Sequence, residues 1–256
     1  MREDKDLEFL NKCDDKDLET LVHILVYDKD GKKRKSECLS TSESYKQSFP
    51  KHGRYCDEII SEIQCYGGNT IANTFRGGKG VTYREILEDV CAKYKVKYES
   101  TLSTIAVEDL LLMSIFESSL DNMGDKERKE LLENFNKKTT DLSTSAIMSI
   151  LQVSIRSSGF ASYRLSAVVV NAVLKTLTGK GLSFVANQTV MRGISIMSGP
   201  IGWSITAGWT AIELAGPAYR VTVPAVMEII YLRRKSNRPF YKIKRWILHI
   251  LYFWKN

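Results

Sequence analysis

The most restrictive feature of the sequence is a nearly uncharged run of 27 residues, 193–219, in which Glu213 is the single charged side chain. Pro200 and Pro217 bound a predicted helix of 16 residues within it, because proline lacks a backbone donor and disfavours helix in the residue before it. That helix would be about 24 Å long, whereas the hydrocarbon core of a bilayer is about 30 Å thick. We therefore expect partial insertion or tight helix packing rather than a simple membrane span.

Charge divides the chain into two parts of different character. Residues 142–256 carry 14 lysines and arginines against two acids, a net charge of +12, whereas residues 1–141 carry 23 basic and 28 acidic residues, a net charge of −5. A basic half indicates an anionic partner, and its aliphatic content favours a membrane surface and makes nucleic acid an unlikely partner. The alternative is a helical region whose few surface charges happen to be basic.

Apolar residues recur at helical intervals through most of the chain, which predicts an all-α, multi-helical fold. In the acidic half the helical segments are amphipathic, and after residue 141 they become apolar on most sides, as in helices buried in a core or in lipid. We expect three regions: an acidic N-terminal helical region (1–141), an apolar, basic, glycine-punctuated helical region (142–235) and a tail helix (236–256).

The tail is predicted to be basic and amphipathic. On a helix, Ile243, Trp246, Ile250 and Trp254 share one face and the basic side chains lie opposite, a pattern typical of a helix in the headgroup region. The alternative is that this face docks on the body of the protein. Combined with the uncharged run, the pattern predicts these membrane-contact residues: Trp203, Trp209, Arg233, Arg234, Lys235, Lys244, Arg245, Trp246, Ile250 and Trp254.

A glycine cluster at residues 67–80 marks a second candidate site. Backbone amides near glycine can bind an anion, and Arg76, Lys79 and Arg84 would add positive charge. A Walker A loop is absent, because Gly80 follows Lys79 where serine or threonine is required. The alternative is a pair of tight turns between short helices.

Sequence patterns typical of catalysis are missing: there is no HExxH, GxSxG, GxGxxG or CxxC. His52 and Cys56 have a spacing that a metal site could use, but no further ligand follows at a diagnostic spacing. We therefore expect a non-enzymatic protein without a metal or cofactor. Five scattered cysteines and an N-terminus without an apolar core predict reduced thiols and a cytoplasmic protein, peripheral or partly inserted at the inner membrane.

Three long motifs resemble the bacterial YaaW family of uncharacterised proteins. They are DLEFLNKCDDKDLETLV, IQCYGGNTIANTFRGGKGVTYREILEDV, and GPIGW followed by AGPAYRVTVPAVMEIIYLRR, and the resemblance covers nearly all of residues 1–235. Relatives labelled ubiquinol-cytochrome c chaperone-like imply an assembly factor that binds a protein client. From the residues themselves, the first expectation is a non-enzymatic, membrane-associated protein that contacts the inner membrane face through its apolar C-terminal region.

Overall fold

The computed structural model describes residues 2–68, 80–157, 159–182 and 218–237. Helices dominate these residues, and their only extended pairing is an isolated antiparallel bridge between Tyr27 and Lys33. The acidic half contains η1 (Glu8–Lys12), α1 (Asp15–Val26), η2 (Leu39–Thr41), α2 (Glu43–Ser48), η3 (His52–Tyr55), α3 (Cys56–Gly67), α5 (Tyr83–Lys93), α6 (Thr104–Leu120) and α7 (Asp125–Asn134). The basic half contains α8 (Thr144–Ser157), α9 (Gly159–Thr178) and α11 (Tyr219–Ser236). The predicted all-α fold is confirmed.

Local side-chain chemistry sets the start of the helices that carry the site. Thr82 and Glu85 form a reciprocal capping box at the start of α5, where the Thr82 amide donates to the Glu85 carboxylate at 2.7 Å. At the start of α6 the Ala106 amide donates to the Ser103 hydroxyl at 3.3 Å. Such caps satisfy backbone donors that have no partner within the helix. The sequence therefore fixes where both helices begin.

Gly80 makes the turn that leads into α5. Its φ is +67°, and a Cβ there would lie 2.6 Å from the backbone of Gln64 in α3. The next amide, that of Val81, donates to the Gln64 carbonyl at 3.1 Å. Only glycine fits both the left-handed conformation and the close approach, so this glycine is explained by a tight turn.

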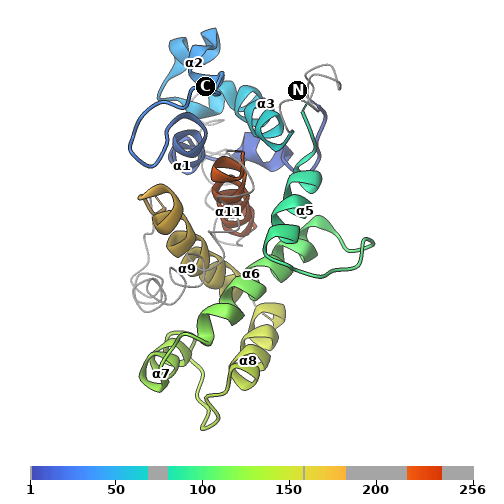
Figure 1. Ribbon diagram of the computed structural model, residues 1–256, viewed down its shortest axis with the longest axis vertical. Helices are drawn as coiled ribbons and strands as arrows, with labels where there is room; N and C mark the ends of the chain where they lie inside the picture. Colours follow the sequence, from blue (N-terminus) through green and yellow to red (C-terminus); the bar gives the residue numbers. More distant parts are fainter. Residues whose placement is uncertain (1, 69–79, 158, 183–217, 238–256) are drawn as a thin grey trace, which may run out of the picture.

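Helix α11 forms the centre of the molecule and is enclosed by α1, α3, α5 and α9 (Figure 1). Every side chain at positions 221–234 is buried, so the helix has no solvent-facing stripe along that length. One hydrophobic cluster joins the buried residues of both halves. The change of composition at position 141 is therefore not a division of the core.

Pro224 lies inside α11 without ending it. Proline removes the hydrogen bond that its nitrogen would donate to the carbonyl four residues earlier, which here belongs to Arg220. Arg220 is exposed, so water can reach that end of the helix. The cost of the proline is thus confined to the exposed first turns of an otherwise buried helix.

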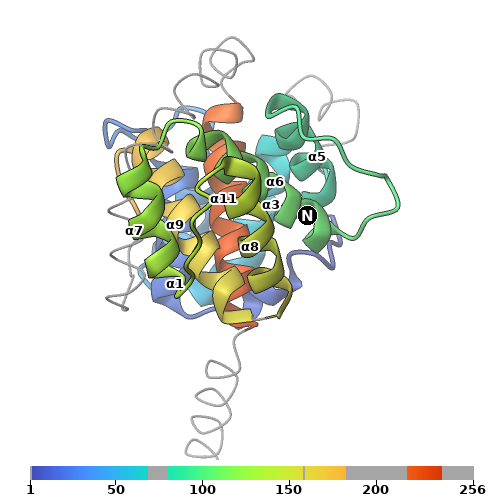
Figure 2. The ribbon, with the colours of Figure 1, turned by 90° about the horizontal axis from the view of Figure 1, so that it is seen from below.

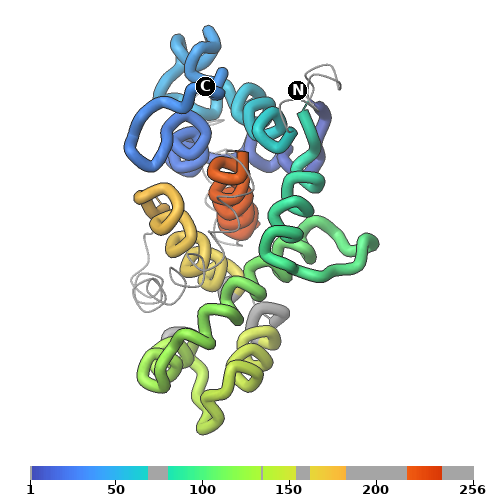
Figure 3. The backbone as a smooth tube through the Cα atoms, in the orientation of Figure 1, coloured from blue at the N-terminus to red at the C-terminus, as the bar shows by residue number. Residues whose placement is uncertain are grey.

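Helices α9 and α11 run alongside one another through the body (Figure 2). The rings of Tyr163 on α9 and Tyr231 on α11 stack at a centroid distance of 5.8 Å. Helix α6 leads out of the body to α7 and α8, which form an arm at one end of the molecule (Figure 3). In the described residues, no helix is long and apolar enough to cross a membrane.

Candidate functional site

The candidate site is the polar interior of the molecule, where α11 directs charged side chains toward its neighbours. Glu228 is 1% exposed, and Arg233 and Arg234 are each 7% exposed. Burying an unpaired charge is costly, so such groups are either matched by partners or neutralised. The two ends of this polar interior use different solutions.

At the C-terminal end of α11, two arginines share one carboxylate. Glu108 on α6 is fully buried, and it accepts a hydrogen bond from Arg233 Nε at 3.0 Å on Oε1, while Arg234 Nη1 lies 3.4 Å from Oε2. The Tyr83 hydroxyl also donates to Oε1, at 2.9 Å. Burial raises the pKa of Glu108, and the two guanidinium groups oppose this shift. Burial has the largest single effect on the pKa of Arg233 and lowers it, but the charge and hydrogen bond of Glu108, together with Tyr83 and Asp6, raise this pKa by more in total. Together these groups form a buried ion cluster.

The remaining donors of the two arginines reach other segments. Arg234 Nη2 donates to Asp109 Oδ1 at 2.7 Å. Arg233 Nη2 donates to the Asp6 carbonyl at 2.8 Å, and its guanidinium lies 4.5 Å from the centroid of the Phe9 ring. Bidentate and multidentate contacts of this kind use the planar arrangement of arginine donors. The ion cluster thereby connects the N-terminal segment, α6 and α11.

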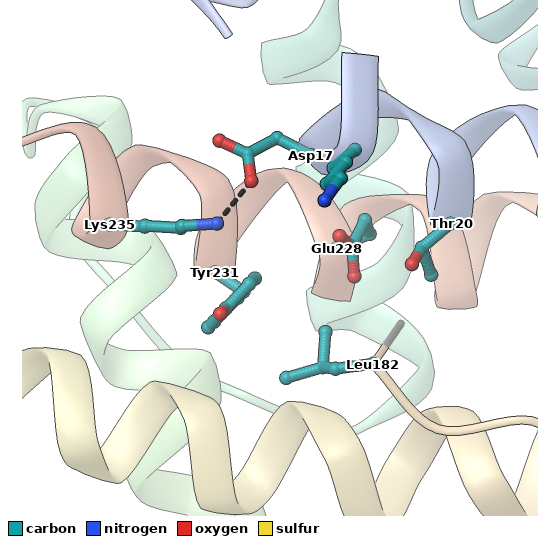
Figure 4. Close-up of a pocket in the computed structure, with 7 residues that line it drawn as sticks. Asp17, Thr20, Leu182, Glu228, Tyr231 and Lys235 are labelled. Carbon is teal, nitrogen blue, oxygen red and sulfur yellow. Dashed lines mark hydrogen bonds and ion pairs between the residues drawn. The ribbon is translucent and has the colours of Figure 1, made fainter. Parts of the chain in front are cut away.

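Glu228 precedes Arg233 on α11 by somewhat more than one helical turn, and it faces a small cavity between α1 and α11 (Figure 4). The cavity has room for about one water molecule, because the centre of such a molecule can move within about 10 Å³. Glu228 Oε2 has no hydrogen-bond partner within the described residues. Burial raises the pKa of Glu228 to about 8, with a smaller opposing effect from Lys235. The cavity is lined by Lys16, Asp17, Thr20, Leu182, Glu228, Tyr231 and Lys235.

This arrangement can exchange a proton, but the cavity is too small for an organic substrate. Lys235 forms an ion pair with Asp17, which fixes one side of the cavity (Figure 4). Glu228 is protonated at neutral pH because its pKa lies near 8.

Among the described side chains, no group of three or more His, Cys, Asp or Glu is placed to hold a metal ion. None of the five cysteines, all of which lie within the described residues, forms a disulfide.

The structure places three of the predicted membrane-contact residues inside the body. Arg233 and Arg234 face Glu108, and Lys235, whose side chain is 15% exposed, pairs with Asp17. Their charges are therefore directed to protein carboxylates, and a contact with lipid headgroups does not fit this placement. The other predicted contacts lie outside the described residues: Trp203, Trp209, Lys244, Arg245, Trp246, Ile250 and Trp254.

Of the predicted anion-binding residues, the structure describes Arg84. Its Nε donates to Glu88 at 2.6 Å and its Nη1 donates to the Leu102 carbonyl at 2.8 Å. These contacts brace α5 against the loop before α6. Arg76 and Lys79 lie outside the described residues, so anion binding at the glycine cluster stays a prediction.

Sequence reasoning missed Glu108 and left the surroundings of Glu228 open. Glu108 follows Val107 and precedes Leu111 and Leu112, so an acid at a core position of α6 was a visible signal of a buried partner. The sequence offers Arg220 and Arg192 as partners for Glu228 and does not choose between them. Arg220 is exposed, and the structure shows no ion pair between it and Glu228, whereas Arg192 lies outside the described residues.

Comparison with known proteins identifies the family. Residues 1–35 match a domain of unknown function (DUF3944), and residues 51–227 match the family model described as Ubiquinol-cytochrome C chaperone. A UPF0174 protein of Helicobacter pylori strain J99 is 44% identical over 236 residues, 92% of this chain and 93% of the relative. UPF0174 protein YaaW of Escherichia coli K12 is 30% identical over 237 residues, 90% of this chain and 94% of the relative. No solved structure matches. The chain therefore belongs to the UPF0174 family, which includes YaaW, and to the family described as ubiquinol-cytochrome C chaperone.

Proposed function

We propose that this protein is a non-enzymatic assembly factor that binds a protein client through its apolar C-terminal region. The observation that carries the proposal is the match of residues 51–227 to a family described as a chaperone. A chaperone acts by binding, and contiguous apolar surface is what such binding uses. The nearly uncharged run 193–219 lies entirely within the matched residues and supplies apolar side chains of that kind.

The body anchors the chain on both sides of this run. On one side the Leu182 amide donates to Asn171 Oδ1 at 2.9 Å, and a Cβ on Gly181 would lie 2.3 Å from the same oxygen. On the other side α11 begins at Tyr219 and is buried from Val221 to Arg234. The buried ion cluster at the far end of α11 then connects this helix to α6 and to the N-terminal segment. These contacts support a rigid base for a client-binding segment.

Site-specific photo-crosslinking in cells tests the proposal. A photoreactive amino acid at Trp209 is expected to give one dominant protein adduct, identified by mass spectrometry. The same probe at Phe49, which is 54% exposed on the body, serves as the control. Assembly of the identified client should fall in a deletion strain and be restored by the wild-type chain but not by Trp209→Asp. Adducts at Phe49 alone, or a client whose assembly is unaffected, would contradict the proposal.

A second candidate function is contact with the inner membrane face through the tail. Its support is the sequence of residues 238–256, with an apolar aromatic face opposite basic side chains. The full chain should pellet with membranes and be released by salt, and a version truncated after Ser236 should stay in the supernatant. Equal behaviour of the two versions would contradict a role for the tail.

A further inference from the structure

A group of exposed cations lies on the surface near the N-terminal end of α11. Its centre is the hairpin at residues 27–35, which the Tyr27–Lys33 bridge closes. The Asp28 carboxylate accepts hydrogen bonds from the Asp30 amide at 3.0 Å and the Lys32 amide at 2.9 Å. Because the Asp28 carboxylate binds two backbone amides of the turn, it stabilises the hairpin in a conformation that exposes its lysines to solvent.

Two other segments bring their charges to the same place. Lys180, in the turn after α9, lies with its Nζ 2.9 Å from His23 Nε2 on α1, and a Cβ on the neighbouring Gly179 would lie 3.7 Å from the Lys29 carbonyl. Figure 2 shows the hairpin and the end of α9 on the side of the molecule opposite the point where α11 ends. Arg220, in the first turn of α11, is close enough to Arg34 to lower its pKa, after the larger effect of burial.

The resulting basic cluster consists of Lys29, Lys32, Arg34, Lys35, Lys180 and Arg220. All except Arg34 are exposed, and none of these six side chains forms an ion pair within the described residues. The acidic side chains of the hairpin are Asp28, which serves the turn, and Asp30 at its tip. Cations from three distant segments thus outnumber the nearby carboxylates, of which Asp28 acts on Arg34 and Glu19 acts on His23 beside Lys180. This excess of positive charge favours an anionic partner.

We propose that the basic cluster docks on anionic phospholipid headgroups. The choice of lipid over nucleic acid follows from the sequence between two of its members, because the uncharged apolar run 193–219 lies between Lys180 and Arg220. Basic side chains beside apolar sequence are typical of a membrane surface contact. The inference goes beyond client binding, and it shares a partner with the second candidate function but not its residues.

The geometry of α11 separates this surface from the tail. The helix comprises 18 residues, a length of about 27 Å. The cluster includes Arg220 near one end, whereas the tail leaves from Asn237 at the other end. A flat membrane that touches the cluster therefore faces away from the point where the tail begins. Lipid contact is assigned to the hairpin side of the molecule.

Vesicle flotation with the purified full chain tests the assignment. The wild type should bind vesicles that contain phosphatidylglycerol, should not bind pure phosphatidylcholine, and should be released as salt screens the charges. Lys32→Glu combined with Lys35→Glu should weaken binding at least about tenfold, because each cation near an anionic surface contributes measurably. Lys126→Glu combined with Lys129→Glu on α7 changes the net charge equally at an exposed, distant place and should leave binding within about twofold.

Three results would overturn the proposal. Equal losses from both lysine pairs would mean that net charge alone drives binding. Loss on truncation after Ser236, with no effect of the hairpin variants, would assign the contact to the tail. Binding of an RNA or DNA duplex that depends on Lys32 and Lys35, without vesicle binding, would assign the cluster to nucleic acid. None of these results bears on the photo-crosslinking test of client binding.

Discussion

Two glutamates are buried against the central helix, and the protein treats them in opposite ways. Glu108 meets two guanidinium groups and a tyrosine hydroxyl. The Oε2 atoms of both glutamates lack a hydrogen-bond partner within the described residues. That of Glu108 lies 3.4 Å from Arg234 Nη1, whereas Glu228 faces a cavity the size of about one water. Burial opposes ionisation of both. For Glu108, charged and hydrogen-bonding partners offset the cost of burying the carboxylate. For Glu228, protonation removes the charge and with it this cost.

The difference teaches what each group contributes to the fold. A matched ion cluster contributes little net stability over apolar packing, but removal of one member leaves a buried charge without compensation. It therefore specifies which helix end meets which segment. A protonated carboxyl requires no charged partner, but its free energy depends on pH. The arginine end of α11 should thus be sensitive to mutation, and the Glu228 region should be sensitive to pH.

The largest expected effect comes from Glu108→Gln. The change keeps the shape of the side chain but leaves Arg233 and Arg234 without their shared carboxylate, which should lower the free energy of unfolding by about 3–5 kcal/mol. Urea unfolding measures this. Glu117→Gln, at an exposed position on the same helix, is the matched control and should change stability by less than about 0.5 kcal/mol. A loss from Glu108→Gln as small as that of the control would show that the cluster is not a buried ion site.

A smaller loss is expected for Arg233→Met, because Glu108 keeps Arg234 as a partner. We expect about 2–3 kcal/mol, and the double variant with Glu108→Gln should lose clearly less than the sum of the two single losses. The combination of Arg233→Met with Glu228→Gln should be additive within about 0.5 kcal/mol. Coupling to Glu228 as strong as to Glu108 would show that the two carboxyl groups belong to one network.

Glu228→Gln should stabilise the protein by an amount that depends on pH. The pKa of Glu228 in the folded state, about 8, lies above its ordinary value of 4.5. As pH rises above about 4.5, the unfolded chain releases this proton while the folded protein keeps it, so the wild type loses stability until about pH 8. Glutamine has no proton to lose, and the advantage of the variant should grow to a few kcal/mol at about pH 8 and then level off. A difference independent of pH would contradict the assignment.

The smallest expected effect is that of Lys235→Met. It removes the partner of Asp17 and the positive charge that lowers the pKa of Glu228. The side chains of Lys235 and Asp17 are 15% and 5% exposed. We expect a loss of about 1–2 kcal/mol, between the values for surface and buried ion pairs, measured by urea unfolding. The titration midpoint of Glu228 should also move to higher pH, and a shift to lower pH would contradict the arrangement around the cavity.

Periodicity predicted much of the fold because helix formation is a local property. Apolar periodicity predicts helices at residues 143–156 and 160–177, and α8 and α9 lie within one residue of these bounds. The sequence also predicts a charged helix at residues 126–138, but α7 (Asp125–Asn134) ends earlier. Asn136 has a φ of +56°, which no α-helix contains. A left-handed residue after the last helical turn is a common way to end a helix.

The polar interior was much harder to predict because its partners are far apart in sequence. Glu108 and Arg233 are separated by 125 residues, and the run YLRRK reads equally well as a basic surface. The sign of the charges along a helix does not reveal whether the folded protein places a buried side chain of opposite charge beside them. Burial of α11 on every side requires the packing of α1, α3, α5 and α9 around it, which no local pattern encodes. The same holds for the basic cluster, since the turn at Gly179 meets Lys29 of the hairpin only in the fold.

The most direct test of the contrast between the two glutamates is a pH titration of their carboxyl carbons by NMR in protein labelled with 13C at glutamate. One glutamate signal should titrate with a midpoint near pH 8, and the same signal should be missing in Glu228→Gln. If every glutamate signal instead titrates near the ordinary pKa of about 4.5, Glu228 is ionised in the folded protein at neutral pH. In that case the proton does not compensate for its burial, and the proposed contrast between the two ends of α11 is wrong.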